Sequence, residues 1–127
     1  MPADPVVVDA SALAALLFGE PGGAGVMNRL EGHVLFAPTL LRLELASVCL
    51  KKTAGEPQKK KRLLAALRLL PRLQVREVQV PSEALVELAR STGLTVYDAA
   101  YLWLSQELGA HLVSLDARLN AAAEKGV

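Results

Sequence analysis

The sequence predicts an α/β fold with three layers, in which a central parallel sheet of four to five strands is flanked by helices. Short apolar runs rich in β-branched residues alternate along the chain with longer helical segments, which is the pattern of a parallel sheet built from successive strand–helix units. Two of these runs, Val6–Val8 and Leu112–Leu115, end directly on an aspartate. Buried strands end in this way where their carboxyl ends open onto a polar site.

The first half of the chain contains the patterns of two strands and three helices. In chain order they are a strand at 6–8, helices at 10–18 and 24–30, a strand at 34–37, and a long helix that Pro38 and Thr39 open and that runs to about Lys52. Glycine and proline gather in the turns at 19–23 and 55–57. The helices at 10–18 and 24–30 are therefore expected to form a helical hairpin.

The second half continues the alternation. Its predicted elements are a basic helix at 58–70, a strand at 73–78, helices at 82–91 and 95–108, a strand from 111 to 115 and a last helix from 117. Thr95 is the expected N-cap of its helix, and Gly93 and Gly109 close the helices at 82–91 and 95–108.

Length and composition predict one domain over residues 1–127. The chain is 52% hydrophobic with a mean hydropathy of +0.31, which excludes a disordered protein. No apolar run approaches the roughly 18 residues that span a bilayer, and no secretory leader is evident, so a cytoplasmic protein without a membrane segment is expected. Cys49 is the only cysteine, which excludes an internal disulfide, and its apolar neighbours predict a buried thiol.

The net charge of +1 hides a strong asymmetry. Between Lys51 and Arg76 lie nine of the 14 basic residues and a single acid, Glu56, for a net charge of +8. The rest of the chain carries five basic and 12 acidic residues, a net charge of −7. A basic segment beside an acidic body suits a polyanionic ligand, although a solvated helix face has the same composition. The segment has no aromatic residue that could stack on bases.

Four acids are candidates for a functional site, and three of them also have a structural interpretation. Asp9 and Asp116 stand at strand ends just before helices, where aspartate is a common N-cap. Asp98 follows Thr95 by three residues, the spacing of a capping box. Glu44 is different, because its helical neighbours four residues before and after it, Leu40 and Val48, are apolar.

A metal ion would explain these acids together. Glu44 on an apolar helix face needs a counter-charge or a metal, and Arg42 points elsewhere on the helix. Carboxylates at strand ends and helix starts face the same edge of a parallel sheet, where they would repel one another without a cation. Oxygen ligands favour Mg²⁺ or Mn²⁺, and no histidine or cysteine pair offers a zinc site. Carboxylate-held metals of this kind hydrolyse phosphodiesters.

The chain resembles the PIN-domain nucleases, and in particular the VapC-like toxins of bacterial and archaeal toxin–antitoxin pairs. Four segments in the family's order carry the resemblance, namely residues 6–13, 43–46, 96–102 and 112–119. The resemblance implies a five-stranded parallel sheet, a Mg²⁺- or Mn²⁺-dependent endoribonuclease acting on an RNA substrate, and a homodimer. Two departures are that Ser114 replaces the family's usual threonine and that residues 126–127 leave little room for its last strand.

The same resemblance assigns the site residues. Asp9, Glu44, Asp98 and Asp116 would form the catalytic, metal-binding quartet, with Asp9 and Asp98 as the first choices for direct ligands. Ser11 would be the hydroxyl that supports them.

A toxin of this family implies a cognate antitoxin protein as partner. The apolar hairpin at 10–30 offers a groove for a partner helix, although most of its apolar residues also suit a plain core.

Other functions remain open at this point. They are a PIN-fold module that binds RNA or protein without catalysis, and a housekeeping RNA-processing nuclease. A phosphoacceptor domain of the haloacid-dehalogenase type would need a second aspartate where Ser11 stands, and a receiver domain would need an acidic pair and a late lysine that are not evident.

Overall fold

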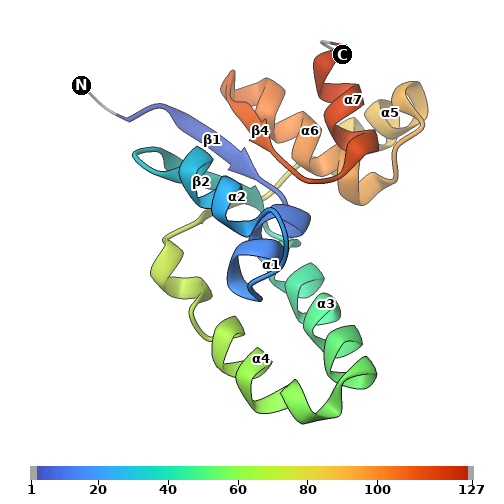
Figure 1. Ribbon diagram of the computed structural model, residues 1–127. Helices are drawn as coiled ribbons and strands as arrows, with labels where there is room; N and C mark the ends of the chain where they lie inside the picture. The colour runs from blue at the N-terminus through green and yellow to red at the C-terminus, as the bar shows by residue number, and fades with distance from the viewer. Residues whose placement is uncertain (1–2, 126–127) are drawn as a thin grey trace.

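The computed structural model describes residues 3–125 and confirms the parallel α/β fold (Figure 1). Its four strands are β1 (Pro5–Val8), β2 (Val34–Pro38), β3 (Arg76–Val78) and β4 (His111–Val113). They form one parallel sheet in the order β3-β2-β1-β4. Strand β1 lies inside the sheet, and its Val7 is in register with Phe36 of β2 and Leu112 of β4.

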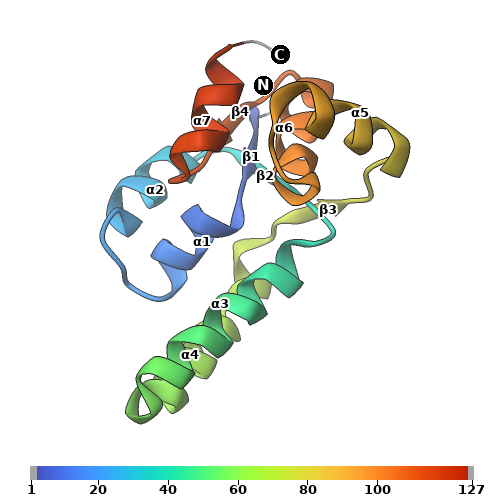
Figure 2. The same cartoon turned by 90° about the vertical axis from the view of Figure 1, so that its right-hand side faces the viewer.

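Seven α-helices are present among the described residues. They are α1 (Ala10–Leu17), α2 (Gly23–Leu30), α3 (Leu41–Gly55), α4 (Lys60–Leu67), α5 (Ser82–Thr92), α6 (Val96–Leu108) and α7 (Ala117–Glu124). Helix α6 packs against β1, β2 and β4. Figure 2 shows α1 and α2 on one side of the sheet and α5 and α6 on the other. None of the described helices combines the length and apolar character that crossing a membrane requires.

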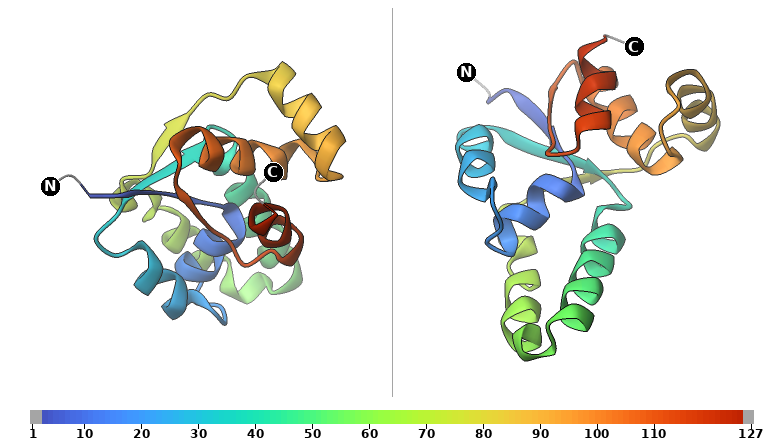
Figure 3. Two further views of the ribbon diagram at one scale, coloured as in Figure 1. Left: turned by 90° about the horizontal axis from the view of Figure 1, so that it is seen from above. Right: turned by 45° about the vertical axis from the view of Figure 1, so that its right-hand side comes forward.

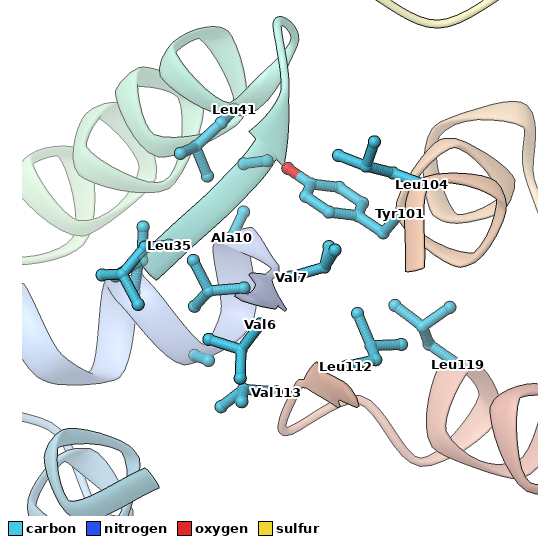
Figure 4. Close-up of a cluster of buried hydrophobic side chains, with 14 of the residues drawn as sticks. Val6, Val7, Ala10, Leu35, Leu41, Tyr101, Leu104, Leu112, Val113 and Leu119 are labelled. Carbon is cyan, nitrogen blue, oxygen red and sulfur yellow. The ribbon is translucent and has the colours of Figure 1, made fainter. Parts of the chain in front are cut away.

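The core forms where both faces of β1 are covered. Val7 and Val8 are completely buried, which explains why the sequence of this strand is an unbroken apolar run. Tyr101 and Leu104 of α6 point toward β1 in the close-up of the core (Figure 4). Cys49 of α3 is buried as predicted.

Helices α3 and α4 form a hairpin that projects away from the sheet (Figure 1; Figure 3, right). The outer part of this hairpin, residues 51–67, is called the arm below. A 3₁₀ turn at Pro57–Lys59 joins its two helices. At the base of the arm, Lys52 of α3 forms an ion pair with Glu20, which follows α1. The arm therefore carries most of the predicted basic segment out from the acidic body.

Two predicted helix boundaries differ from the structure because of prolines. The long helix begins at Leu41, since Pro38 is the last residue of β2, and it extends to Gly55. The basic helix predicted at 58–70 covers only Lys60–Leu67, between the 3₁₀ turns at Pro57–Lys59 and Leu70–Leu73. Proline favours such first-turn positions and cannot continue a helix interior.

Two predicted strands are shorter than expected. Strand β3 begins only at Arg76, because the 3₁₀ turn reaches Leu73 and Gln74 then adopts a left-handed φ of +54°. Strand β4 ends at Val113 because its partner β1 ends at Val8, directly opposite, where Asp9 begins α1 as its N-cap. The last short strand considered at residues 126–127 lies outside the described residues.

Candidate active site

A pocket of about 280 Å³ lies at the carboxyl edge of the sheet and brings all five predicted site residues together. It is called the acidic pocket below. Its lining residues are Asp9, Ala10, Ser11, Glu44, Ser47, Val48, Lys51, Asp98, Tyr101 and Asp116. Four elements contribute these side chains, because α1 follows β1, α3 follows β2, α7 follows β4, and α6 begins beside them. The predicted meeting of distant acids at one sheet edge is therefore correct.

Asp9 is the most enclosed acid of the pocket, with 4% of its surface exposed. Its Oδ1 accepts hydrogen bonds from the Ser11 hydroxyl at 2.7 Å and from the Ala12 N–H at 3.0 Å, and its Oδ2 accepts one from the Ser114 hydroxyl at 2.6 Å. Asp9 is thus an N-cap, as the structural interpretation predicted, and it also faces the pocket. Burial raises its pKa despite the hydrogen bonds, and the charge of Asp116 adds to this rise.

The support of Asp9 extends across the sheet through Ser114. The Ser114 hydroxyl donates to Asp9 and accepts the Asp116 N–H at 2.9 Å, so one side chain orients two acids. Ser11 has a similar double role, because its hydroxyl donates to Asp9 and accepts the Leu115 N–H at 3.0 Å. Ser114, which replaces the threonine of the family pattern, therefore keeps the hydroxyl that bonds to Asp9 and to the backbone of Asp116.

Glu44 reaches the pocket from the first turn of α3 and is half-buried. Its Oε1 accepts a 2.6 Å hydrogen bond from the Tyr101 hydroxyl of α6. Burial raises the pKa of Glu44, the Tyr101 bond lowers it, and the charges of Asp98 and Asp9 raise it further. Burial and Glu44 together raise the pKa of Tyr101, so its hydroxyl keeps the proton that it donates.

Asp98 and Asp116 complete the acidic lining. Asp98 lies in the first turn of α6, where its N–H donates to the Thr95 hydroxyl at 3.1 Å, as the capping pattern predicted. Burial raises the pKa of Asp98, and the charges of Asp116 and Asp9 add to the effect. Asp116 is the N-cap of α7, since its Oδ1 accepts the Leu119 N–H at 3.0 Å.

The carboxylates of the pocket form no ion pairs among the described residues, although the charge of Arg118 lowers the pKa of Asp98. Among residues 3–125 there are three ion pairs, and none includes Asp9, Glu44, Asp98 or Asp116. Arg42, two residues from Glu44, pairs with Glu77 on another face of the helix. The prediction that Arg42 points away from Glu44 is correct, and the hydrogen-bond partner of the Glu44 carboxylate is the neutral hydroxyl of Tyr101.

The donor set of the acidic pocket suits a hard divalent cation. Within residues 3–125, no three acid, histidine or cysteine side chains stand close enough to enclose a metal ion in this conformation. The pocket nevertheless gathers four carboxylates, and burial together with mutual repulsion raises the pKa of three of them. Such a set of oxygen donors matches the ligand preference of Mg²⁺ and Mn²⁺.

Six lining or supporting residues were missed by sequence reasoning as members of the site, namely Ala10, Ser47, Val48, Lys51, Tyr101 and Ser114. Tyr101 follows Asp98 by three residues on α6, so helical spacing alone could have placed both on one face. Lys51 follows Glu44 by seven residues on α3 and could have been found in the same way. Ser114 was noted only as a hydroxyl in the family pattern, because its bond to Asp9 depends on β1 and β4 being neighbours.

Comparisons with known proteins agree with this architecture. The sequence pattern of the PIN domain matches residues 6–125. Ribonuclease VapC12, from two strains of Mycobacterium tuberculosis, is 31% identical over 115 residues, which cover 90% of this chain and 88% of the relative.

Two solved structures have a similar fold. PAE2754 from Pyrobaculum aerophilum superimposes with a TM-score of 0.77 at 25% identity, over 95% of this chain and 86% of that one. The sarcin-ricin loop cleaving toxin VapC20 of Mycobacterium tuberculosis has a TM-score of 0.67 at 19% identity, over 92% and 94% of the two chains.

Proposed function

Since the chain belongs to the PIN domain family, we propose that it is a Mg²⁺- or Mn²⁺-dependent endoribonuclease and the toxin of a toxin–antitoxin pair. The observation that carries this proposal is the acidic pocket, where four carboxylates from distant segments face one space and take part in none of the ion pairs among the described residues. The name of the relative, ribonuclease VapC12, supports RNA as the substrate. Hydrolysis by water does not need the ribose 2′-hydroxyl, so the acids alone do not select RNA over DNA.

The pocket residues have distinct proposed roles. Asp9 and Asp98 are the first choices for direct metal ligands, with Asp116 and Glu44 completing the set directly or through water. A bound Mg²⁺ or Mn²⁺ would polarise the phosphate and lower the pKa of a coordinated water. Ser11 and Ser114 hold the Asp9 carboxylate in place through its two oxygens.

Glu44 is the proposed proton acceptor for the attacking water. The Tyr101 hydroxyl occupies Oε1, which leaves Oε2 to accept a proton. Tyr101 acts through Glu44 as a positioning residue, because its own raised pKa keeps the phenol protonated.

The antitoxin and a homodimer are also proposed, each with its own support. Leu16 and Met27 of the α1–α2 hairpin line a hollow of about 590 Å³ that could receive an antitoxin segment, whereas Leu13 and Val26 are buried in the core as the alternative interpretation expected. On the outer face of α3, Leu43 and Leu50 are 77% and 69% exposed at a spacing of two turns. Such an apolar stripe suits contact with a second copy of the chain.

The experiment that tests the function is cleavage of structured RNAs by the purified protein with Mg²⁺, Mn²⁺ or EDTA. Wild type should cut only with metal, and Asp98→Asn should cut at least about a hundredfold more slowly, because several kcal/mol of charge stabilisation are lost. Asp4→Asn is the matched control, since Asp4 is exposed just before β1, at the opposite end of that strand from Asp9. Equal activity in EDTA, or full activity of Asp98→Asn, would contradict the metal-dependent mechanism. An absence of cleavage under every metal condition would leave a binding module as the leading alternative.

A further inference from the structure

One face of α3 runs from the centre of the acidic pocket toward the arm. Glu44, Ser47, Val48 and Lys51 all line the pocket, and their spacing of three and four residues places them in one stripe along the helix. Lys51 is the only basic residue among the described residues that line the pocket. The ammonium group of Lys51 therefore stands at one end of this stripe, and the carboxylate of Glu44 stands at the other.

Lys51 and its neighbour Lys52 have different environments. Lys52 is half-buried, forms an ion pair with Glu20 and lies over the ring of Phe18 at 6.0 Å. Lys51 is exposed and takes part in none of the three ion pairs among residues 3–125. The charge of Lys52 is thus used within the fold, whereas that of Lys51 is available to a ligand in the pocket.

The position of Lys51 fits a phosphate next to the one that the acids would process. Seven residues of α-helix separate it from Glu44, which corresponds to about 10 Å along the helix axis. A stacked nucleic-acid strand advances about 3.4 Å per nucleotide, so this span covers about three nucleotides. The lysine can therefore contact a phosphate of the same strand without neutralising the carboxylates.

We propose that Lys51 binds a backbone phosphate of the RNA strand within about three nucleotides of the cleaved bond and so sets the direction in which the strand leaves the acidic pocket. This inference rests on the proposed function and adds the path of its substrate. Lys51 is the first residue of the basic segment 51–76, so the strand passes from the pocket onto the arm. Figure 2 shows α3 running continuously from the body of the protein to the tip of the arm.

The test compares Lys51→Gln with Lys52→Gln, which remove the same charge one residue apart. Both are made in the full chain with Asp98→Asn, so that a fluorescent single-stranded RNA is bound but not cut. Lys51→Gln should weaken binding about tenfold and reduce the slope of log affinity against log salt by about 0.7, the value for one phosphate contact on a single strand. Lys52→Gln should leave the slope unchanged, and Lys51→Arg should restore it.

A kinetic comparison of Lys51→Gln with wild type, both of which retain Asp98, adds a second readout. Lys51→Gln should raise KM about tenfold and leave kcat within about twofold, because Lys51 contacts the strand away from the reacting phosphate. Equal changes of the salt slope in Lys51→Gln and Lys52→Gln would overturn the inference in favour of a general positive field. The inference would also be overturned if Lys51→Gln bound RNA as tightly as the protein that retains Lys51 and showed a larger Mn²⁺-induced rise in Tm. That result would mean that Lys51 screens the charges of the acids.

These outcomes are separate from the test of the proposed function. Wild type could cut RNA with metal while Lys51→Gln binds RNA as tightly as the protein that retains Lys51. In that case the nuclease proposal stands and the proposed role of Lys51 is wrong. If wild type cuts no RNA under any metal condition, the nuclease proposal fails, and the binding measurement still decides whether Lys51 holds a phosphate.

Discussion

The acidic pocket and the basic arm carry opposite charges in opposite environments. In the pocket, Asp9 is buried and bonded through both oxygens, and Glu44 is held by a tyrosine hydroxyl. In the arm, Lys52 and Lys59 are half-buried and form ion pairs, whereas the other basic residues are exposed on α3 and α4, namely Lys51, Lys60, Lys61 and Arg62. Asp9 and Glu44 are therefore held in defined positions, whereas four charges of the arm are exposed and outside the ion pairs of the described residues.

This difference separates two uses of electrostatics in one protein. Burial and mutual repulsion make the charged state of the pocket acids costly, so they are stabilised only by specific partners or by a cation. Exposed lysines cost little and act on a polyanion roughly in proportion to their number. Changes in the pocket should therefore have large effects specific to one residue, and changes in the arm should have smaller effects that add.

The largest expected effect on stability comes from Asp9→Ala. This change removes the N-cap of α1 and leaves the hydroxyls of Ser11 and Ser114 without their acceptor. The free energy of unfolding should fall by about 3 kcal/mol, the sum of a lost cap and unsatisfied buried donors. Urea unfolding of the metal-free proteins measures it.

Asp98→Ala is the matched comparison within the same pocket. Asp98 is half-buried, and the bond that caps α6 comes from its backbone N–H, which alanine keeps. Its free energy of unfolding should change by less than about 1 kcal/mol. A loss as large as that of Asp9→Ala would show that the two acids are equally part of the framework and would weaken the contrast between them.

The next largest effect is stabilisation by the metal. At a Mn²⁺ concentration a hundred times its Kd, the native state should gain about 2.7 kcal/mol, which corresponds to a rise in Tm of about 10 °C for a chain of this size. Thermal unfolding followed by circular dichroism measures the shift. Neutralising the arm should not affect it, whereas Asp98→Asn should remove most of it.

The pH dependence of this shift follows from the raised pKa values of Asp9, Glu44 and Asp98. A carboxyl whose pKa is higher in the folded protein contributes stability that is complete below its unfolded value, near 4, and is lost as pH rises through the folded value. Metal must displace those protons, so its stabilising effect grows over the same range. The rise in Tm should be larger at pH 7 than at pH 5, and an equal rise at both values would contradict a site built from these acids.

The sequence predicted the body of this site because its signals are local. Each acid stands at a strand end or in a first helical turn, and the parallel topology brings such positions to one edge. The capping roles of Asp9 and Asp116 were predicted for the same reason, and in the structure both residues also face the pocket. Metal binding and the catalytic roles of these residues remain predictions.

The parts that were not predicted depend on contacts between distant segments. The hydroxyl of Tyr101 meets Glu44 across 57 positions of sequence, and that of Ser114 meets Asp9 across 105. No local pattern encodes either pair. The boundaries around the arm were wrong for a different reason, because prolines and 3₁₀ turns interrupted a periodicity that alone favoured one longer helix at 58–70.

A smaller effect is expected from neutralising the tip of the arm. Lys60, Lys61 and Arg62 changed together to glutamine should reduce the salt slope of RNA binding by about 2 and weaken binding by roughly 10- to 30-fold, with kcat unchanged. Fluorescence anisotropy over a salt series measures the slope. Arg90→Gln, an exposed change on α5, is the control. An unchanged slope for the triple variant would contradict the proposal that the exposed charges of the arm contribute to RNA binding.

The smallest effect should come from Lys52→Ala. Its ion pair with Glu20 joins the base of the arm to the α1–α2 hairpin, and the pair is partly exposed, so its loss should cost about 0.5–1 kcal/mol of unfolding free energy. Lys51→Ala, without an ion pair among the described residues, should change it by less than about 0.5 kcal/mol. Urea unfolding at low and high salt measures both, and the Lys52 effect should shrink with salt. Equal losses for the two lysines would mean that Lys51 also serves the fold, and that its charge is less free for a ligand than its surroundings indicate.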